Sequence, residues 1–194
     1  MGDAKALYEI AIQHNKRVIV MSPVKGGLLA EFPVAAKGYI EHLAPQLSAA
    51  SLAMRFCLSL EGVATILSGM SNMQQMEENI ATFRAFSQIS KIDSSAIAYV
   101  LDALSFTGRI GCTQCKYCSS CPHKIAIPYI LNLYNHFREG RYTRLQASKI
   151  YLSRYAAQLS QCVNCKICEQ YCPQNLKIAA HLKEINELFR ESYS

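Results

Sequence analysis

The sequence contains CTQCKYCSSCP at residues 112–122 and CVNCKICEQYCP at residues 162–173. Each stretch packs four cysteines into about a dozen residues and ends in Cys-Pro. Together they hold eight of the nine cysteines in the chain. The ninth, Cys57, lies among apolar residues at helical spacing in SLAMRFCLSL, which predicts a small core side chain. The two cysteine runs therefore decide what kind of domain the second half of the chain forms.

Three kinds of chemistry use closely spaced cysteines. Disulfides suit small secreted domains, but MGDAKALYEI at the start of the sequence lacks the pattern of a secretory signal. Structural zinc usually takes two ligand pairs separated by a longer loop. Here three cysteines follow one another as Cys-x2-Cys-x2-Cys, with a fourth before proline, and this pattern favours a [4Fe–4S] cubane over zinc.

A cubane needs one thiolate at each of its four irons, and a Cys-x2-Cys-x2-Cys loop supplies three. In the two-cluster bacterial ferredoxin pattern, which these runs resemble, the fourth thiolate is the Cys-Pro cysteine of the other run. The resemblance implies one cluster on Cys112, Cys115, Cys118 and Cys172, and a second on Cys162, Cys165, Cys168 and Cys121. The gap between Cys118 and Cys121 is one residue shorter than the gap between Cys168 and Cys172, so the position of Cys121 is the less regular one.

The net charge of +6 lies entirely in residues 110–194. A recognition motif for nucleic acid is not evident there, so no nucleic-acid partner is expected. Four thiolates and an oxidised cubane sum to about −2, so two clusters would lower the excess to about +2. Four lysines stand beside the runs and either damp the field of the clusters or are ordinary solvated side chains: Lys116, Lys124, Lys166 and Lys177.

Helices are predicted between and after the runs, over Pro128–Arg138 and Thr143–Leu159. A closing helix is indicated by apolar residues at helical spacing, namely Ile178, Leu182, Ile185 and Phe189. This arrangement resembles the α-helical type of ferredoxin. His123 and His181 lie near the runs, but eight cysteines already satisfy two clusters.

The first 109 residues show an α/β pattern. Two short apolar runs, RVIVMSP from Arg17 and VATIL at 63–67, predict strands buried on both faces, as in a parallel sheet. Helices are predicted over Ala4–His14, Ser48–Leu60 and Ser94–Leu104. Another helix is indicated by an apolar stripe made of Met73, Met76, Ile80 and Phe83.

At residues 18–30, VIVMSPVKGGLLA, and 63–80, VATILSGMSNMQQMEENI, the chain resembles the seventh and eighth strand–loop units of the aldo/keto reductase barrel. The cysteine-bearing tail resembles that of the subgroup with a C-terminal ferredoxin domain. The resemblance implies a mostly α protein with a small α/β part: a partial TIM-type (β/α)8 barrel at 1–109 and an α-helical ferredoxin domain with two [4Fe–4S] clusters at 110–194.

The same resemblance implies an NADP(H) or NAD(H) site in the complete protein. In the family, the loop after strand seven follows the nicotinamide and pyrophosphate, and here it holds Ser22, Val24 and Gly26. The segment after strand eight holds the adenosine part, and here it provides Ser71, Gln75, Glu78 and Asn79. Gly69 and Gln75 stand where many members carry basic residues, so the choice between NADP and NAD is open. Without any ligand, Asn72 and Gln75 would form a helix-capping pair, and Glu78 and Asn79 would be solvated.

A (β/α)8 barrel takes roughly 250 residues, whereas 111 residues precede Cys112. The family's catalytic Asp, Tyr, Lys and His come from early strands, and no position here matches them. We therefore expect the C-terminal part of a larger reductase, with no catalytic residue in the chain itself.

The sequence thus predicts an iron–sulfur electron-transfer module of an aldo/keto reductase-like oxidoreductase. Its expected partner is an electron donor or acceptor protein, or the remainder of the barrel. One alternative is part of an active NAD(P)-dependent reductase completed by another chain, and another is a zinc-stapled structural domain. No apolar run reaches the roughly 18 residues of a membrane span, and we expect a cytoplasmic location, where thiols stay reduced.

Overall fold

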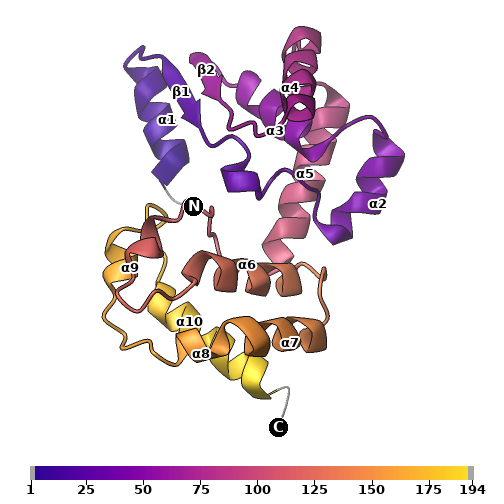
Figure 1. The fold of residues 1–194 in the computed structure, drawn as a ribbon. Helices are drawn as coiled ribbons and strands as arrows, with labels where there is room; N and C mark the ends of the chain where they lie inside the picture. The colour runs from indigo at the N-terminus through magenta and orange to yellow at the C-terminus, as the bar shows by residue number, and fades with distance from the viewer. Residues whose placement is uncertain (1–2, 192–194) are drawn as a thin grey trace. The chain divides into compact units, whose positions relative to one another are not determined.

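The computed structural model describes residues 3–191 of the chain (Figure 1). The chain divides into two compact units, Met1–Ala103 and Leu104–Ser194. The sequence placed the boundary between residues 109 and 110. In the structure, one helix, α5 (Lys91–Phe106), runs through the division.

The first unit combines helices with one small sheet. Strands β1 (Val18–Met21) and β2 (Val63–Leu67) pair in parallel, with Val18 opposite Val63 and Met21 opposite Leu67. Besides the first part of α5, the helices of this unit are α1 (Asp3–Gln13), the short 3₁₀ helix η1 (Lys25–Gly27), α2 (Val34–Leu43), α3 (Ala49–Leu58) and α4 (Met73–Ala85).

Short polar side chains decide where two of these helices, α3 and α5, begin. The Ser48 hydroxyl accepts a hydrogen bond from the backbone N–H of Ser51 at 3.0 Å, which caps α3. The Ser90 hydroxyl accepts from the backbone N–H of Asp93 at 3.0 Å, and the Asp93 carboxylate accepts from the Ser90 N–H at 2.9 Å. These reciprocal bonds satisfy backbone donors that a helix end leaves free.

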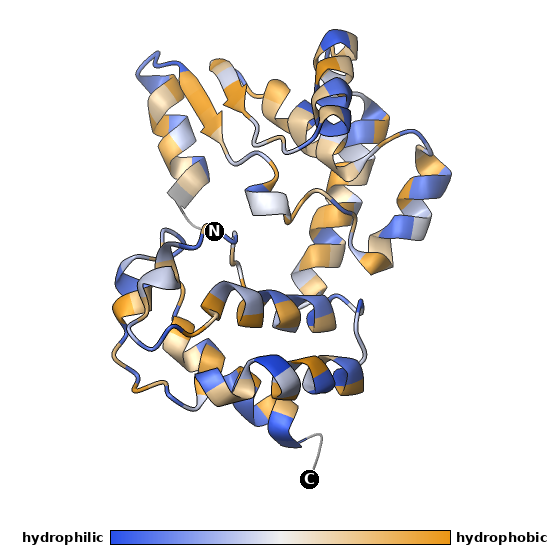
Figure 2. Cartoon of the chain, in the orientation of Figure 1, coloured by the Kyte–Doolittle hydropathy of each residue, from blue (hydrophilic) through white to orange (hydrophobic). Residues whose placement is uncertain are grey.

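The prediction that both strands are buried on both faces was wrong. The strands form and pair as expected, and β1 is apolar along its length (Figure 2). However, Ile19 is 58% exposed, Met21 is 74% exposed and Leu67 is 50% exposed. Side chains of a strand alternate between two faces, and within this unit only one face of the two-stranded sheet is covered.

The second unit is helical. The cysteine runs contain the 3₁₀ helix η2 (Tyr117–Ser120) and the short helix α9 (Ile167–Gln170). The longer helices are α6 (Ile127–Arg138), α7 (Arg144–Arg154) and α10 (Ile178–Arg190), and α8 (Ala156–Leu159) is a single turn. The predicted helix over 143–159 is thus two helices, because Tyr155 leaves the helical conformation at φ −125°.

Helices α6, α7 and α10 pack on one another and enclose the larger of the two cores. The predicted stripe of α10 is confirmed, since all four of its apolar residues are at most 1% exposed. The ring of Phe189 lies 5.8 Å from that of Phe137 and 5.6 Å from that of Tyr151, measured between ring centroids. Within residues 3–191, none of the helices has the length and apolar character that crossing a membrane requires.

Candidate metal centre

The two cysteine runs adopt similar backbone conformations at three matching places. Both loops bend into the left-handed conformation at three matching places: two residues after the first cysteine, directly after the second, and three residues after the last. The φ values at these places are 56° and 56° for Gln114 and Asn164, 65° and 59° for Lys116 and Lys166, and 52° and 52° for Lys124 and Asn175. Alternation between right- and left-handed residues turns successive N–H groups inward, and such concave nests bind anions and iron–sulfur clusters.

The repeat continues into the helix that follows each run. Helices α6 and α10 begin at Ile127 and Ile178, each six residues after the Cys-Pro cysteine. A tight turn precedes both starts, since the N–H of Ile127 donates to the Ile125 carbonyl at 2.8 Å and that of Ile178 donates to the Leu176 carbonyl at 2.9 Å. The chain therefore contains two copies of one unit, a cysteine loop followed by a helix.

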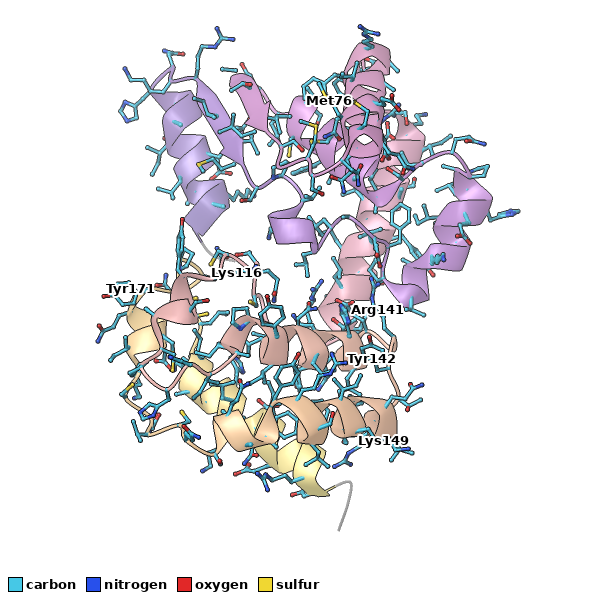
Figure 3. The ribbon with its side chains drawn as sticks, in the orientation of Figure 1. Met76, Lys116, Arg141, Tyr142, Lys149 and Tyr171 are labelled. Atoms are coloured by element: carbon cyan, nitrogen blue, oxygen red, sulfur yellow. The ribbon has the colours of Figure 1, made fainter. Side chains whose placement is uncertain are left out.

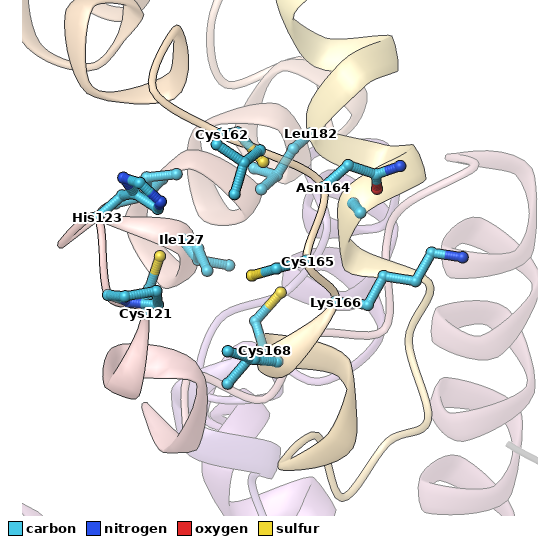
Figure 4. A pocket seen from close by; sticks show the side chains of 14 residues that line it. Cys121, His123, Ile127, Cys162, Asn164, Cys165, Lys166, Cys168 and Leu182 are labelled. Carbon is cyan, nitrogen blue, oxygen red and sulfur yellow. The ribbon is translucent and has the colours of Figure 1, made fainter.

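The eight cysteines line two separate cavities, four around each. Figure 4 shows the first cavity, where the labelled sulfurs stand around a shared space. The cysteines of the first cavity are Cys121, Cys162, Cys165 and Cys168. The cysteines of the second are Cys112, Cys115, Cys118 and Cys172. Each cavity thus takes three cysteines from one run and the Cys-Pro cysteine of the other, the same sets that the ferredoxin pattern implies.

Apolar side chains form the inner walls of both cavities. Ile125, Ile127 and Leu182 line the first. Pro128, Leu131 and Ile178 line the second. Across residues 3–191, no three His, Cys, Asp or Glu side chains converge closely enough to hold a single metal ion.

Cys121 reaches its cavity although its run is one residue shorter. The segment between Cys118 and Cys121 is the 3₁₀ helix η2, whereas the matching segment of the second run is the α-helical turn α9. A 3₁₀ helix rises about 2.0 Å per residue, compared with 1.5 Å for an α-helix. The tighter winding covers a similar distance with fewer residues, which accounts for the irregular spacing seen in the sequence.

Burial and mutual repulsion disfavour free thiolates in these sites. Burial raises the pKa of Cys118 to about 11, and the neighbouring Cys112 and Cys115 thiolates add to the rise. Burial also raises the pKa of Cys168 to about 11, with further contributions from Glu169 and from Cys121. Four thiolates around one cavity therefore need a positively charged partner between them, and the metal ions of a cluster supply one.

Solvent reaches one side of each cysteine set. Cys115, Cys162 and Cys165 are exposed, whereas Cys118 and Cys168 are buried. Of the four lysines beside the runs, Lys116 and Lys166 line the mouths of the cavities. The other two, Lys124 and Lys177, are exposed on the loops that lead to α6 and α10.

The two histidines differ in position. His123 lies among the residues that line the first cavity, beside the cysteine sulfurs. His181 instead approaches Glu184 one turn along α10, with 3.8 Å between Nδ1 and Oε2. Each cavity already offers four thiols without either imidazole.

Sequence reasoning missed two polar residues of this unit. The side-chain amide of Gln114 donates to the Cys112 sulfur at 3.5 Å and to the Pro128 carbonyl at 2.8 Å. Asn135 is 1% exposed and exchanges two 2.8 Å hydrogen bonds with the backbone of Ile110, just before the first run. Only the position of Gln114 between two cysteines signalled its role, and nothing in the sequence marked Asn135.

The predicted nucleotide residues all lie in the first unit. Ser22 and Gly26 take positive φ values of 53° and 67° after β1, with Val24 between them. The Gln75 side chain accepts hydrogen bonds from Ser71, from its N–H at 2.8 Å and from its hydroxyl at 3.2 Å. Among the described residues, these five line neither of the two cavities.

The capping alternative for this segment is present in the structure. The Asn72 side chain accepts from the Gln75 N–H at 2.9 Å and so caps α4. Glu78 accepts a hydrogen bond from the Ser48 hydroxyl, and Asn79 donates to the Ser68 hydroxyl at 3.0 Å. Cys57 is a core residue as predicted, 6% exposed, and burial raises the pKa of its thiol.

Comparison with protein families assigns both halves. Residues 2–102 match the aldo/keto reductase family. The chain belongs to this family. Residues 111–178, which include all eight clustered cysteines, match a 4Fe–4S dicluster domain. No curated protein and no solved structure matches the chain. The chain is therefore an oxidoreductase of the aldo/keto reductase family, a family of TIM barrels, joined to an iron–sulfur domain of the ferredoxin type.

Proposed function

We propose that this chain is an electron-transfer module of an aldo/keto reductase-like oxidoreductase and binds two [4Fe–4S] clusters. The observation that carries the proposal is the division of the eight cysteines into two sets of four, each completed by the other run. Cys112, Cys115, Cys118 and Cys172 hold one cluster, and Cys121, Cys162, Cys165 and Cys168 hold the other.

The residues around the sulfurs fit such a group. The inward-turned N–H groups of both loops and the lysines at the cavity mouths offset the negative charge of thiolate-bound clusters. The apolar walls exclude water from the inner side, and the exposed cysteines leave a short route to the surface. When bound, a [4Fe–4S] cluster supplies one-electron transfer. The expected partner is an external one-electron donor or acceptor protein, in a reducing compartment such as the cytoplasm.

Metal analysis tests this function. Protein purified anaerobically is expected to contain about eight irons and eight acid-labile sulfides per chain and to be brown, with visible absorption that fades on reduction. Zinc without sulfide would favour the structural alternative and would refute the proposal.

Single substitutions test the exchange of ligands between the runs. Cys121→Ser is expected to impair the cluster that Cys162, Cys165 and Cys168 also hold. Cys172→Ser is expected to impair the other cluster. Cys57→Ala is the matched control, because Cys57 lies in the other unit and is a core residue. Full iron and sulfide content is expected for this control.

The family match supports a second candidate, a part of an NAD(P)-dependent reductase that another polypeptide completes. In this arrangement, β1 and β2 are the last two strands of the barrel, and their uncovered face receives the remainder. Ser22, Val24 and Gly26, together with Ser71, Gln75, Glu78 and Asn79, would then contact the nucleotide. Tight NADPH binding to this chain, measured by fluorescence titration, would favour this candidate. We expect no reduction of ketones or aldehydes by the chain alone.

A further inference from the structure

The two cysteine loops have similar backbone conformations but differ in the charges beside them. Three residues before the first cysteine of each run stand Arg109 and Leu159, respectively. Directly after the third cysteine stand Ser119 and Glu169. One loop therefore carries an added positive charge and the other an added negative charge at positions that the repeat makes equivalent.

Arg109 is held in place below the first loop. Its side chain is 10% exposed and pairs with Glu139 at 3.0 Å, and Glu139 also pairs with Arg141 at 2.9 Å. Glu139 therefore pairs with two guanidinium groups, those of Arg109 and Arg141. Burial lowers the pKa of Arg109. The negative charges of Glu139 and of the Cys112 thiolate oppose this change. The guanidinium group of Arg109 therefore stays protonated. Its Nε–H is buried without a hydrogen-bond partner among the described residues.

Gln114 donates a hydrogen bond to a cysteine sulfur. Among the described residues, the equivalent residue of the second loop makes no such bond. The side-chain amide of Gln114 donates to the Cys112 sulfur at 3.5 Å while the Pro128 carbonyl fixes its orientation. The equivalent residue, Asn164, is exposed, and in Figure 4 its side chain points away from the sulfurs. Hydrogen bonds to ligand sulfurs and nearby positive charges stabilise the more negative, reduced form of an iron–sulfur site.

Glu169 acts in the opposite direction on the other set. It follows Cys168 directly, and its Oε1 is fixed by a 2.9 Å hydrogen bond from the backbone N–H of Ala179. Lys116 and Lys166 occupy equivalent positions at the two mouths, so their effects on the two sets largely cancel. His123 lines the cavity of the Cys168 set, where Gln174 occupies the equivalent position in the other cavity.

We propose that Arg109 and Gln114, together with Glu169, set the two sites apart in reduction potential. The set of Cys112, Cys115, Cys118 and Cys172 then has the higher potential. The inference rests on the proposed two-cluster function. Reduction by one electron at this set lowers the charge of its cluster from 2+ to 1+, with no proton and no bond change. The electron comes from an external one-electron reductant and is held at this set of cysteines.

Potentiometric titration of the full chain tests the inference. Dithionite with mediators reduces the anaerobic protein at one fixed pH, and electron paramagnetic resonance follows each step. The wild type is expected to show two separate one-electron potentials. Glu169→Gln keeps an acceptor for the Ala179 N–H and removes the charge, so the lower potential is expected to rise while the upper one stays.

Arg109 provides the complementary variants. Arg109→Leu, which copies the Leu159 position, is expected to lower the upper potential and leave the lower one in place. Arg109→Lys keeps the charge and is expected to retain most of the upper potential. Lys149→Leu is the control, since Lys149 is exposed on α7 and lies far from Lys116 and Tyr171 in Figure 3. This control is expected to leave both potentials unchanged.

The outcomes separate the inference from the function on which it rests. Two clusters with equal potentials would overturn the inference and leave the electron-transfer function standing. A Glu169→Gln variant that shifts the upper potential instead of the lower one would also overturn it. Absence of iron and sulfide from the wild type would refute the function itself. If Arg109→Leu does not accumulate as folded protein, Glu169→Gln and Arg109→Lys decide the result.

Discussion

Asn135 is a single buried side chain that fixes where the first cysteine loop begins. Its amide nitrogen donates to the Ile110 carbonyl, and its amide oxygen accepts from the Ile110 N–H, both at 2.8 Å. Ile110 in turn precedes Cys112, whose N–H donates to the Ile110 carbonyl at 2.8 Å. One polar residue in the core of α6 thus holds the entry of the metal-binding loop.

Removal of this anchor is expected to be costly. Asn135→Ala leaves a buried N–H and a buried carbonyl without partners, which should lower the free energy of unfolding by about 3 kcal/mol. Urea unfolding of the loaded protein measures the loss. Asn132→Ala on the same helix is the control and should cost much less, because Asn132 is only half-buried. Equal losses in the two variants would contradict the anchoring role.

Asp93 gives the first unit a stability that depends on pH. The side chain is 2% exposed, and both of its oxygens accept hydrogen bonds from Arg55, at 2.7 and 2.8 Å. Burial alone would raise the pKa of Asp93. The hydrogen bonds from Ser90 and the charge of Arg55 outweigh burial, so the pKa lies below the ordinary value of 3.8.

A lowered pKa in the folded state means that the stabilisation is fully present above the ordinary value and disappears as the pH falls through the lower, folded-state pKa. At neutral pH, Asp93→Asn should cost about 2 kcal/mol, because the buried charge pair is lost. Hydrogen exchange of α3 and α5 between about pH 2 and pH 6 measures this. The difference between wild type and variant should shrink toward the acid end, and a constant difference would contradict the assignment.

At the scale of elements, the helices of the second unit depend on one shared core. Phe189 of α10 contacts the rings of Phe137 on α6 and Tyr151 on α7, so three helices meet at one side chain. Phe189→Ala should lower the free energy of unfolding by about 4 kcal/mol. Lys183→Ala on the exposed face of α10 should change it by less than about 0.5 kcal/mol. Similar losses for the two variants in urea unfolding would disprove this account of the core.

Most of these elements could be predicted from local patterns. The apolar spacing in α10 and the capping residue Ser48 each mark a helix by short-range chemistry. Helix α2 was missed because Gly38, a poor helix former, lies in its middle. The helix is nevertheless continuous, and its residues Ala36 and Ile40 are fully buried. The break at Tyr155 and the open face of the strands arise from packing, which short-range patterns do not contain.

The candidate site also combines features that local sequence patterns predict with features that arise only from packing. The resemblance of the cysteine runs to the two-cluster ferredoxin pattern predicted two sets of four thiols, and the two cavities are lined by the same sets. The neighbours that distinguish the sets could not be predicted. Arg109 becomes relevant only because Glu139, thirty residues later, fixes it beside the first loop.

At the scale of the whole chain, the first unit presents apolar surface that its own residues leave uncovered. Ile19, Met21 and Leu67 are at least half exposed on the strands, and Met73 is 67% exposed on α4. Edge strands and large apolar patches favour association with other polypeptides. We expect the isolated chain to self-associate as its concentration rises.

Light scattering after size-exclusion chromatography measures this association. The double variant Met21→Thr with Leu67→Thr should shift the chain toward the monomer, since it makes the uncovered strand face more polar. Leu145→Thr, on the exposed surface of α7 in the other unit, is the control and should leave the association unchanged. A wild-type chain that stays monomeric at every concentration would contradict the prediction.

The exchange of Cys121 and Cys172 between the loops also governs how the protein can be made. On a ribosome, the loop that starts at Cys112 emerges before the second loop but lacks the fourth cysteine of its set until Cys172 has been synthesised. On the two-cluster proposal, metal loading of either site must therefore wait until cysteines of the second run have been translated. For the same reason, a nonsense codon between the two runs would leave both sets of cysteines incomplete.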